Sequence, residues 1–140
     1  MSKHNPDKQL PSKEEILSIS AKNYMNTDQL AYFNSALLAL YDATLNNIQR
    51  AKAQLHQRQS TSEVRDSAKR QQLSNFSRRT VERQQKLLPE INDALIRVRQ
   101  KTYGYCKKSG KPIGIARLIE YPTALYAAEI RQLQEFEAKR

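Results

Sequence analysis

The sequence predicts a mainly α-helical protein: a long antiparallel coiled-coil hairpin, a small zinc-finger-like globular head and a C-terminal helix. Glycine and proline are scarce, at 3 and 5 of 140 residues, which favours long helices over a turn-rich β fold. Only 39% of the residues are hydrophobic and the mean hydropathy is −0.79, too polar for a large compact core. Two long segments place apolar residues every three or four positions, as the buried stripe of a helix does.

Residues 1–25 are predicted to form a flexible N-terminal arm. They are polar, contain two prolines and show no clear period, although a short helix near 14–19 fits the pattern. Asn26 or Thr27 is a suitable N-cap for the helix that follows, because both side chains accept hydrogen bonds from free helix amides.

The coiled-coil hairpin is predicted over residues 26–102. Its first helix carries an apolar stripe made of Leu30, Phe33, Leu37, Leu40, Tyr41, Leu45, Ile48, Ala51 and Leu55. A polar segment at about 58–68 breaks this stripe and forms the tip. The stripe of the second helix consists of Leu73, Phe76, Thr80, Leu87, Ile91, Leu95 and Val98. Because each helix alone would be marginal in water, we expect the two to fold back and bury both stripes.

Pro89 falls inside the second helix. A proline there removes a backbone hydrogen bond and clashes with the preceding turn, so we expect a kink. The alternative is a helix that starts anew at Leu88 and Pro89, since proline fits the first helical turn. The apolar stripe continues on both sides and favours the kink.

Residues 103–123 hold all three glycines and two of the prolines, and are predicted to form the small head. Residues 124–140 are predicted to form the C-terminal helix. The apolar face of that helix would consist of Tyr126, Ile130, Leu133 and Phe136.

Basic residues outnumber acidic ones by 24 to 14, a formal charge of +10. Ten basic and three acidic residues lie within 50–86, a net charge of +7 in that stretch. Such a surface suits nucleic acid, a solvated helix face or an acid-lined protein channel. We expect no membrane span and no signal peptide, because no apolar run is long enough. A single cysteine forms no internal disulfide, which indicates a cytoplasmic location.

Cys106 occupies the first position of a zinc-ribbon frame. Such a frame needs two C-x2-C pairs separated by roughly 15–20 residues. Its four positions are degenerate here: Cys106, Ser109, Ala127 and Ile130. Serine is a poor zinc ligand, and alanine and isoleucine have no ligand atom, so we expect no metal and no zinc. We assign no site to the isolated His4 and His56. Since no nucleophile–base set or phosphate-binding loop is present, we expect no catalytic residue and no enzyme activity.

Three separated motifs resemble those of a known family. They are YMNTDQLAYF at 24–33, EVRDSA at 63–68, and the run YGYC, IGIARL and YPTA within 103–124. In this order they resemble the DksA/TraR family of bacterial RNA polymerase-binding transcription factors, over about residues 24–136. The chain looks like a member that has lost its zinc ligands. The resemblance implies a hairpin that enters the polymerase secondary channel and destabilises promoter open complexes.

The resemblance also implies roles for single residues. The coiled-coil tip that acts in the polymerase channel would be Glu63, Asp66 and Ala68, with Glu63 replacing the aspartate of the family motif. From composition alone, the two acids would only offset the helix dipole. Contacts to the polymerase and to the nucleotide site at its rim would come from Arg79, Arg83, Leu87 and Arg131. From composition alone, the basic side chains would serve solubility.

The alarmone ppGpp is a further expectation from the resemblance. Its site would involve positions 90, 121 and 131, which hold Glu90, Tyr121 and Arg131 here. The first two are basic in zinc-bearing relatives. Because Glu90 would repel phosphates and Tyr121 is uncharged, we expect weak ppGpp dependence.

These features predict a monomeric cytoplasmic regulator of transcription initiation, with bacterial RNA polymerase as its partner and neither membrane nor sequence-specific DNA binding. One alternative is a basic coiled-coil module that binds nucleic acid directly, with a steep salt dependence. A second alternative is a Gre-like stimulator of transcript cleavage.

Overall fold

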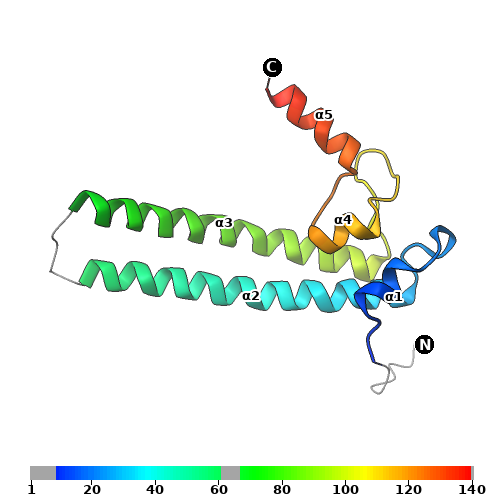
Figure 1. Ribbon diagram of the computed structural model, residues 1–140, viewed down its shortest axis with the longest axis horizontal. Helices are drawn as coiled ribbons and strands as arrows, with labels where there is room; N and C mark the ends of the chain where they lie inside the picture. The colour runs from blue at the N-terminus through cyan, green and yellow to red at the C-terminus, as the bar shows by residue number, and fades with distance from the viewer. Residues whose placement is uncertain (1–8, 61–66, 140) are drawn as a thin grey trace. The chain divides into compact units, whose positions relative to one another are not determined.

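The computed structural model describes residues 9–60 and 67–139. These ranges hold two long and several short helices (Figure 1): α1 (Lys13–Leu17), the 3-10 helix η1 (Ala21–Asn23), α2 (Thr27–Ser60), α3 (Ser67–Gln100), α4 (Ile115–Glu120) and α5 (Ala128–Ala138). The predicted fold class, mainly α with a two-helix hairpin, is confirmed. Among the helices of the described ranges, none combines the length and apolar character needed to cross a bilayer.

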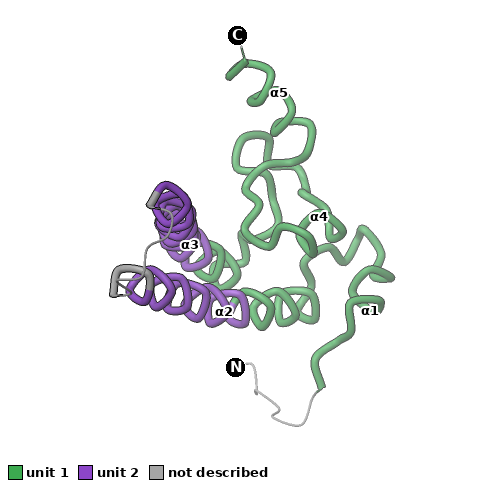
Figure 2. Tube along the Cα trace, turned by 60° about the vertical axis from the view of Figure 1, so that its left-hand side comes forward, with its two compact units in different colours: residues 1–37, 94–140 green, residues 38–93 purple. Residues whose placement is uncertain are grey.

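The chain divides into two compact units (Figure 2). Unit 1 comprises residues 1–37 and 94–140, and unit 2 comprises residues 38–93. Unit 2 is the part of the hairpin nearer the 60–67 connection, and its α2 and α3 segments lie side by side. Unit 1 holds the start of α2, the end of α3 and every shorter helix.

The seam of unit 2 is more polar than the sequence stripes predict. From α2 it buries Thr44, Ile48 and Ala51, and from α3 it buries Ser77 and Ile91. The Thr44 hydroxyl donates to the Leu40 carbonyl at 2.7 Å, which satisfies this polar group within its own helix.

Three residues assigned to the stripes are exposed instead. The exposed fractions are 38% for Leu45, 42% for Leu73 and 67% for Phe76. The reason is helical phase: successive residues differ by about 100° around the axis, so Thr44 and Ser77 face the partner helix while their neighbours Leu45 and Phe76 turn outward.

The segment before α2 is packed rather than a free arm. Asn26 caps α2 as predicted, accepting a hydrogen bond from the Gln29 amide at 2.9 Å. The Gln29 side chain is buried; it accepts from the Met25 amide at 2.6 Å and donates to the Ile16 carbonyl at 3.0 Å. Ile16 is fully buried, and its helix α1 packs against α4. A short helix is thus present where the sequence pattern allowed one, near 14–19, and an apolar anchor and a buried amide hold it.

Helix α3 runs through Pro89 without a restart. The alternative of a new helix beginning at Leu88 and Pro89 is therefore wrong. The helix closes at its C-terminus with Lys101 in the left-handed region, at φ 62°, and the Thr102 amide donating to the Arg97 carbonyl at 2.9 Å.

Tyr103 is the centre of the head. It is fully buried, its ring lies 5.3 Å from that of Phe33, and its hydroxyl donates to the Pro122 carbonyl at 2.7 Å. The remaining buried hydrophobic residues of unit 1 are Ile16, Met25, Leu37, Ala94, Val98, Cys106, Ile113 and Leu118. Each large side chain buried in this way contributes about 1.5–3 kcal/mol.

Helix α5 begins at Ala128, four residues later than predicted. The preceding residues hydrogen-bond the head instead: the Lys107 amide donates to the Leu125 carbonyl at 2.8 Å, and Arg117 Nε donates to the Tyr126 carbonyl at 3.3 Å. The predicted apolar face of α5 is only partly buried: Tyr126 and Ile130 are half-buried, whereas Leu133 is 58% and Phe136 is 62% exposed.

Candidate functional site

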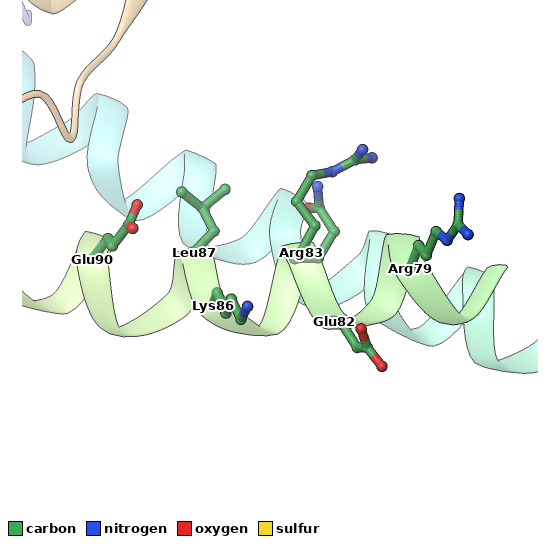
Figure 3. Close-up of a pocket in the computed structure, with 7 residues that line it drawn as sticks. Arg79, Glu82, Arg83, Lys86, Leu87 and Glu90 are labelled. Carbon is green, nitrogen blue, oxygen red and sulfur yellow. The ribbon is translucent and has the colours of Figure 1, made fainter. Parts of the chain in front are cut away.

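The polymerase and rim residues assigned to the second hairpin helix come together at one hollow on α3. The hollow has a volume of about 540 Å³ and belongs entirely to unit 2. Its lining residues are Arg79, Glu82, Arg83, Gln84, Lys86, Leu87 and Glu90 (Figure 3). Arg79, Arg83 and Leu87 thus share one lining, and their role as polymerase contacts stays a prediction.

Helix spacing explains the arrangement of four of these side chains, the α3 row. Arg79, Arg83, Leu87 and Glu90 are separated by four, four and three residues, so they lie along one helix face. Figure 3 shows them projecting from the same side of α3, whereas Glu82 projects from the other.

A polar contact joins the two helices beside the α3 row. Gln84 lies next to Arg83 and is half-buried, and its Oε1 accepts a hydrogen bond from Asn47 Nδ2 of α2 at 3.5 Å.

The charges of the α3 row are exposed and unpaired within the described ranges. Arg79, Arg83 and Glu90 are exposed, Leu87 is half-buried, and the three charged side chains form no ion pair there. Two like charges at positions i and i+4 destabilise a helix by about 0.2–0.5 kcal/mol. The arginine pair by itself therefore does not stabilise the helix.

Two of the three predicted tip residues, Glu63 and Asp66, lie outside the described ranges. Ala68 is exposed near the start of α3. The tip assignment therefore depends on the sequence motif.

Three of the four degenerate ribbon positions, Cys106, Ser109 and Ala127, lie close together. Cys106 is 3% exposed, and its sulfur accepts hydrogen bonds from the Ser109 hydroxyl and from the amides of Ala127, Ser109 and Lys108. Burial raises the pKa of the Cys106 thiol, but the hydrogen bonds outweigh it and lower the pKa to about 7. Ile130 is half-buried. Within the described ranges no three potential ligand side chains gather to hold a metal.

Arg131, the remaining predicted rim contact, lies on α5 in unit 1. Its Nε is 3.4 Å from Glu135 Oε1, one helical turn further on, and both side chains are exposed. Tyr121 is 58% exposed, and the Arg117 guanidinium lies 5.6 Å from its ring centre. The guanidinium beside Tyr121 therefore belongs to Arg117, which is also in unit 1.

Sequence reasoning missed one set of hydrogen bonds in the head and three residues of the hollow. The hydroxyl of Tyr24 joins two loops of the head, although its motif had been noted only as a resemblance. Glu82, Gln84 and Lys86 also line the hollow.

Comparisons with known proteins point to one family. The chain matches the model of the family described as "DnaK suppressor protein DksA, N-terminal domain" over residues 29–98. It is 35% identical to the RNA polymerase-binding transcription factor DksA of Caulobacter vibrioides over 127 residues, covering 90% of this chain and 89% of that protein. It is 28% identical to the Escherichia coli K12 protein of the same name over 120 residues, covering 85% and 80%.

A solved structure extends the likeness to the fold. Transcription factor DksA2 from Pseudomonas aeruginosa superimposes with a TM-score of 0.80 at 30% sequence identity, covering 92% of this chain and 100% of that one. The family match, the identity over nine-tenths of the chain and the shared fold agree with the three motifs. The chain belongs to the DksA/TraR family.

Proposed function

We propose that this protein binds bacterial RNA polymerase through the secondary channel and modulates transcription initiation by destabilising promoter open complexes. The observation that carries the proposal is the 35% identity, over nine-tenths of both chains, to a protein named as an RNA polymerase-binding transcription factor.

The chemistry of unit 2 supports a protein channel as the binding site. A two-helix rod is narrow enough to enter a channel, and the α3 row offers Arg79 and Arg83 to acidic groups on its wall. Exposed charge of one sign also raises the rate of encounter with an oppositely charged cleft. Glu63, Asp66 and Ala68 at the tip would act after docking, near the catalytic Mg²⁺ of the polymerase.

The proposed role is regulatory and non-catalytic, and it needs neither zinc nor a strong ppGpp effect. The hydrogen-bonded Cys106 and the apolar core around Tyr103 support a head that folds without metal. The protein would act as a cytoplasmic monomer.

Co-migration with core RNA polymerase in gel filtration tests the proposal. We expect the wild-type protein to elute with the polymerase, and Arg79→Ala plus Arg83→Ala to bind about tenfold more weakly. The matched control is Arg50→Ala plus Lys52→Ala, which removes the same charge from exposed positions of α2. Absence of co-migration by the wild-type protein would contradict the proposal.

The same proteins separate polymerase binding from direct nucleic-acid binding. A protein that binds nucleic acid directly would bind duplex DNA in the absence of polymerase, and its affinity would fall steeply as the salt concentration rises. For such a protein, the Arg79/Arg83 and Arg50/Lys52 double variants would lose affinity equally. Counterion release depends on how many charges are removed rather than on where they lie.

A further inference from the structure

The charge of the α3 row changes sign along the helix. Arg79 and Arg83 are cationic, Leu87 is apolar and Glu90 is anionic, and all four line the same hollow (Figure 3). At 1.5 Å per residue, the two arginines are about 6 Å apart along the helix axis and Glu90 lies about 10 Å beyond Arg83. A ligand that spans the row therefore meets both signs.

The carboxylate of Glu90 is exposed and forms no ion pair in the described part of the chain. The residue is in the interior of a helix that runs from Ser67 to Gln100, far from the N-terminal turn where an acid offsets the helix dipole. Lys86 lies four residues earlier, but the described part of the chain contains no ion pair between Lys86 and Glu90. The lysine-before-glutamate order is also the weaker of the two i,i+4 arrangements.

The mixed row does not suit a polyanion. Nucleic acid or a polyphosphate laid along it would gain from Arg79 and Arg83 but would bring phosphates toward Glu90, a like-charge contact. A protein surface carries both signs and can satisfy the whole row, with Leu87 covering an apolar side chain between them.

We infer that Glu90 selects the partner: it pairs with a lysine or arginine of a protein surface whose carboxylates meet Arg79 and Arg83. The inference rests on the proposed docking of the α3 row and adds the chemistry of the docked surface. On that surface, a basic side chain lies about 10 Å from the acids, matching the spacing of Arg83 and Glu90.

Charge reversal with a matched control tests this inference. Glu90→Lys and Asp42→Lys change the net charge equally, and Asp42 is exposed on α2 outside the hollow. Dissociation constants for core RNA polymerase are measured without ppGpp. We expect Glu90→Lys to weaken binding about tenfold or more, Glu90→Gln to weaken it less, and Asp42→Lys to change it less than about threefold.

A photo-cross-linking amino acid at position 90 then identifies the facing segment of the polymerase. We expect a segment with a lysine or arginine, and its reversal to glutamate to restore the binding of Glu90→Lys. If the wild-type protein binds but Glu90→Lys binds as well or better, the inference is overturned and the proposed function stands. If the wild-type protein does not bind polymerase, both are overturned.

Discussion

The Tyr24 hydroxyl donates a hydrogen bond to the Gly104 carbonyl at 2.6 Å, joining residues 80 positions apart. The same oxygen accepts a hydrogen bond from the Gly114 amide at 3.0 Å, and the Tyr24 ring meets Tyr105 edge to face at 5.5 Å. Burial raises the pKa of Tyr24, which keeps the hydroxyl protonated as a donor. One side chain ahead of α2 therefore ties together two turns of the head.

Removing this hydroxyl should destabilise the protein. Tyr24→Phe leaves the partly buried Gly114 amide without its acceptor, whereas the Gly104 carbonyl keeps the hydrogen bond from the Ile113 amide at 2.8 Å. The expected cost is about 1–3 kcal/mol in the free energy of unfolding. Urea denaturation followed by tyrosine fluorescence measures this. Tyr121→Phe is the control, because Tyr121 is largely exposed. Equal stability of the two variants would refute the role of the Tyr24 hydroxyl.

The Cys106 thiol should titrate near neutral pH. Its pKa is about 7, below the ordinary value of 9.0, because burial is outweighed by hydrogen bonds from Ser109, Ala127 and Lys108. We expect a thiolate absorbance at 240 nm with a midpoint near pH 7, absent in Cys106→Ser. Ser109→Ala should move the midpoint upward, since it removes the hydroxyl donor.

This pKa also sets a direction for the pH dependence of stability. The folded pKa is lower than the unfolded one, so folding favours the thiolate, and this stabilisation is present above pH 9 and is lost as the pH falls from 9 to 7. The difference in unfolding free energy between the wild-type protein and Cys106→Ser should therefore shrink over that range. A difference that grows with falling pH would show that the thiol is buried in its neutral form.

The head should fold without zinc. A structural zinc contributes about 10–16 kcal/mol in small zinc-finger peptides, so a protein that depended on it would unfold with a chelator. We expect metal analysis to find no bound zinc, and a chelator to leave the melting temperature unchanged. Ser109→Cys, Ala127→Cys and Ile130→Cys together should create a cobalt-binding site with thiolate absorbance. One tightly held zinc per wild-type chain would contradict this prediction.

The tip acids should act on initiation more than on binding. Glu63→Ala plus Asp66→Asn removes charge from the hairpin tip and leaves the α3 row unchanged. We expect polymerase affinity to change less than about threefold and inhibition of a sensitive promoter to be lost. Run-off transcription with the wild-type protein and the double variant, each at saturating concentration, measures this. Inhibition by the variant at the wild-type level would show that the tip assignment is wrong.

Potentiation by ppGpp should be weak. The resemblance implies a ppGpp site at positions 90, 121 and 131. Glu90 would add negative charge there, Tyr121 would offer a hydroxyl only, and Arg131 already pairs with Glu135 at 3.4 Å. The assay compares initiation with and without ppGpp, using polymerase that lacks its other ppGpp site. We expect little change. Strong enhancement that Arg131→Ala abolishes would show that the site is retained.

Much of the fold could be predicted from the sequence because helix periodicity is a local property. The spacing of apolar residues, the polar break at the tip and Asn26 as a cap indicate the two long helices, and the glycines locate the head. The motifs indicate the family, and the separation of Arg79, Arg83 and Leu87 already places them on one helix face.

Only the tertiary structure decided which distant residues meet. The sequence by itself determined helices, hairpin, head and family, but not that Gln29 reaches the Ile16 carbonyl or that Tyr24 binds Gly104. The apolar stripe of a helix spans more of its circumference than the partner helix covers. The seam therefore buries Ser77, while Phe76 remains exposed. Contacts between residues 80 or 90 positions apart leave no periodic signal, because they depend on how the elements pack rather than on the pattern within any one of them.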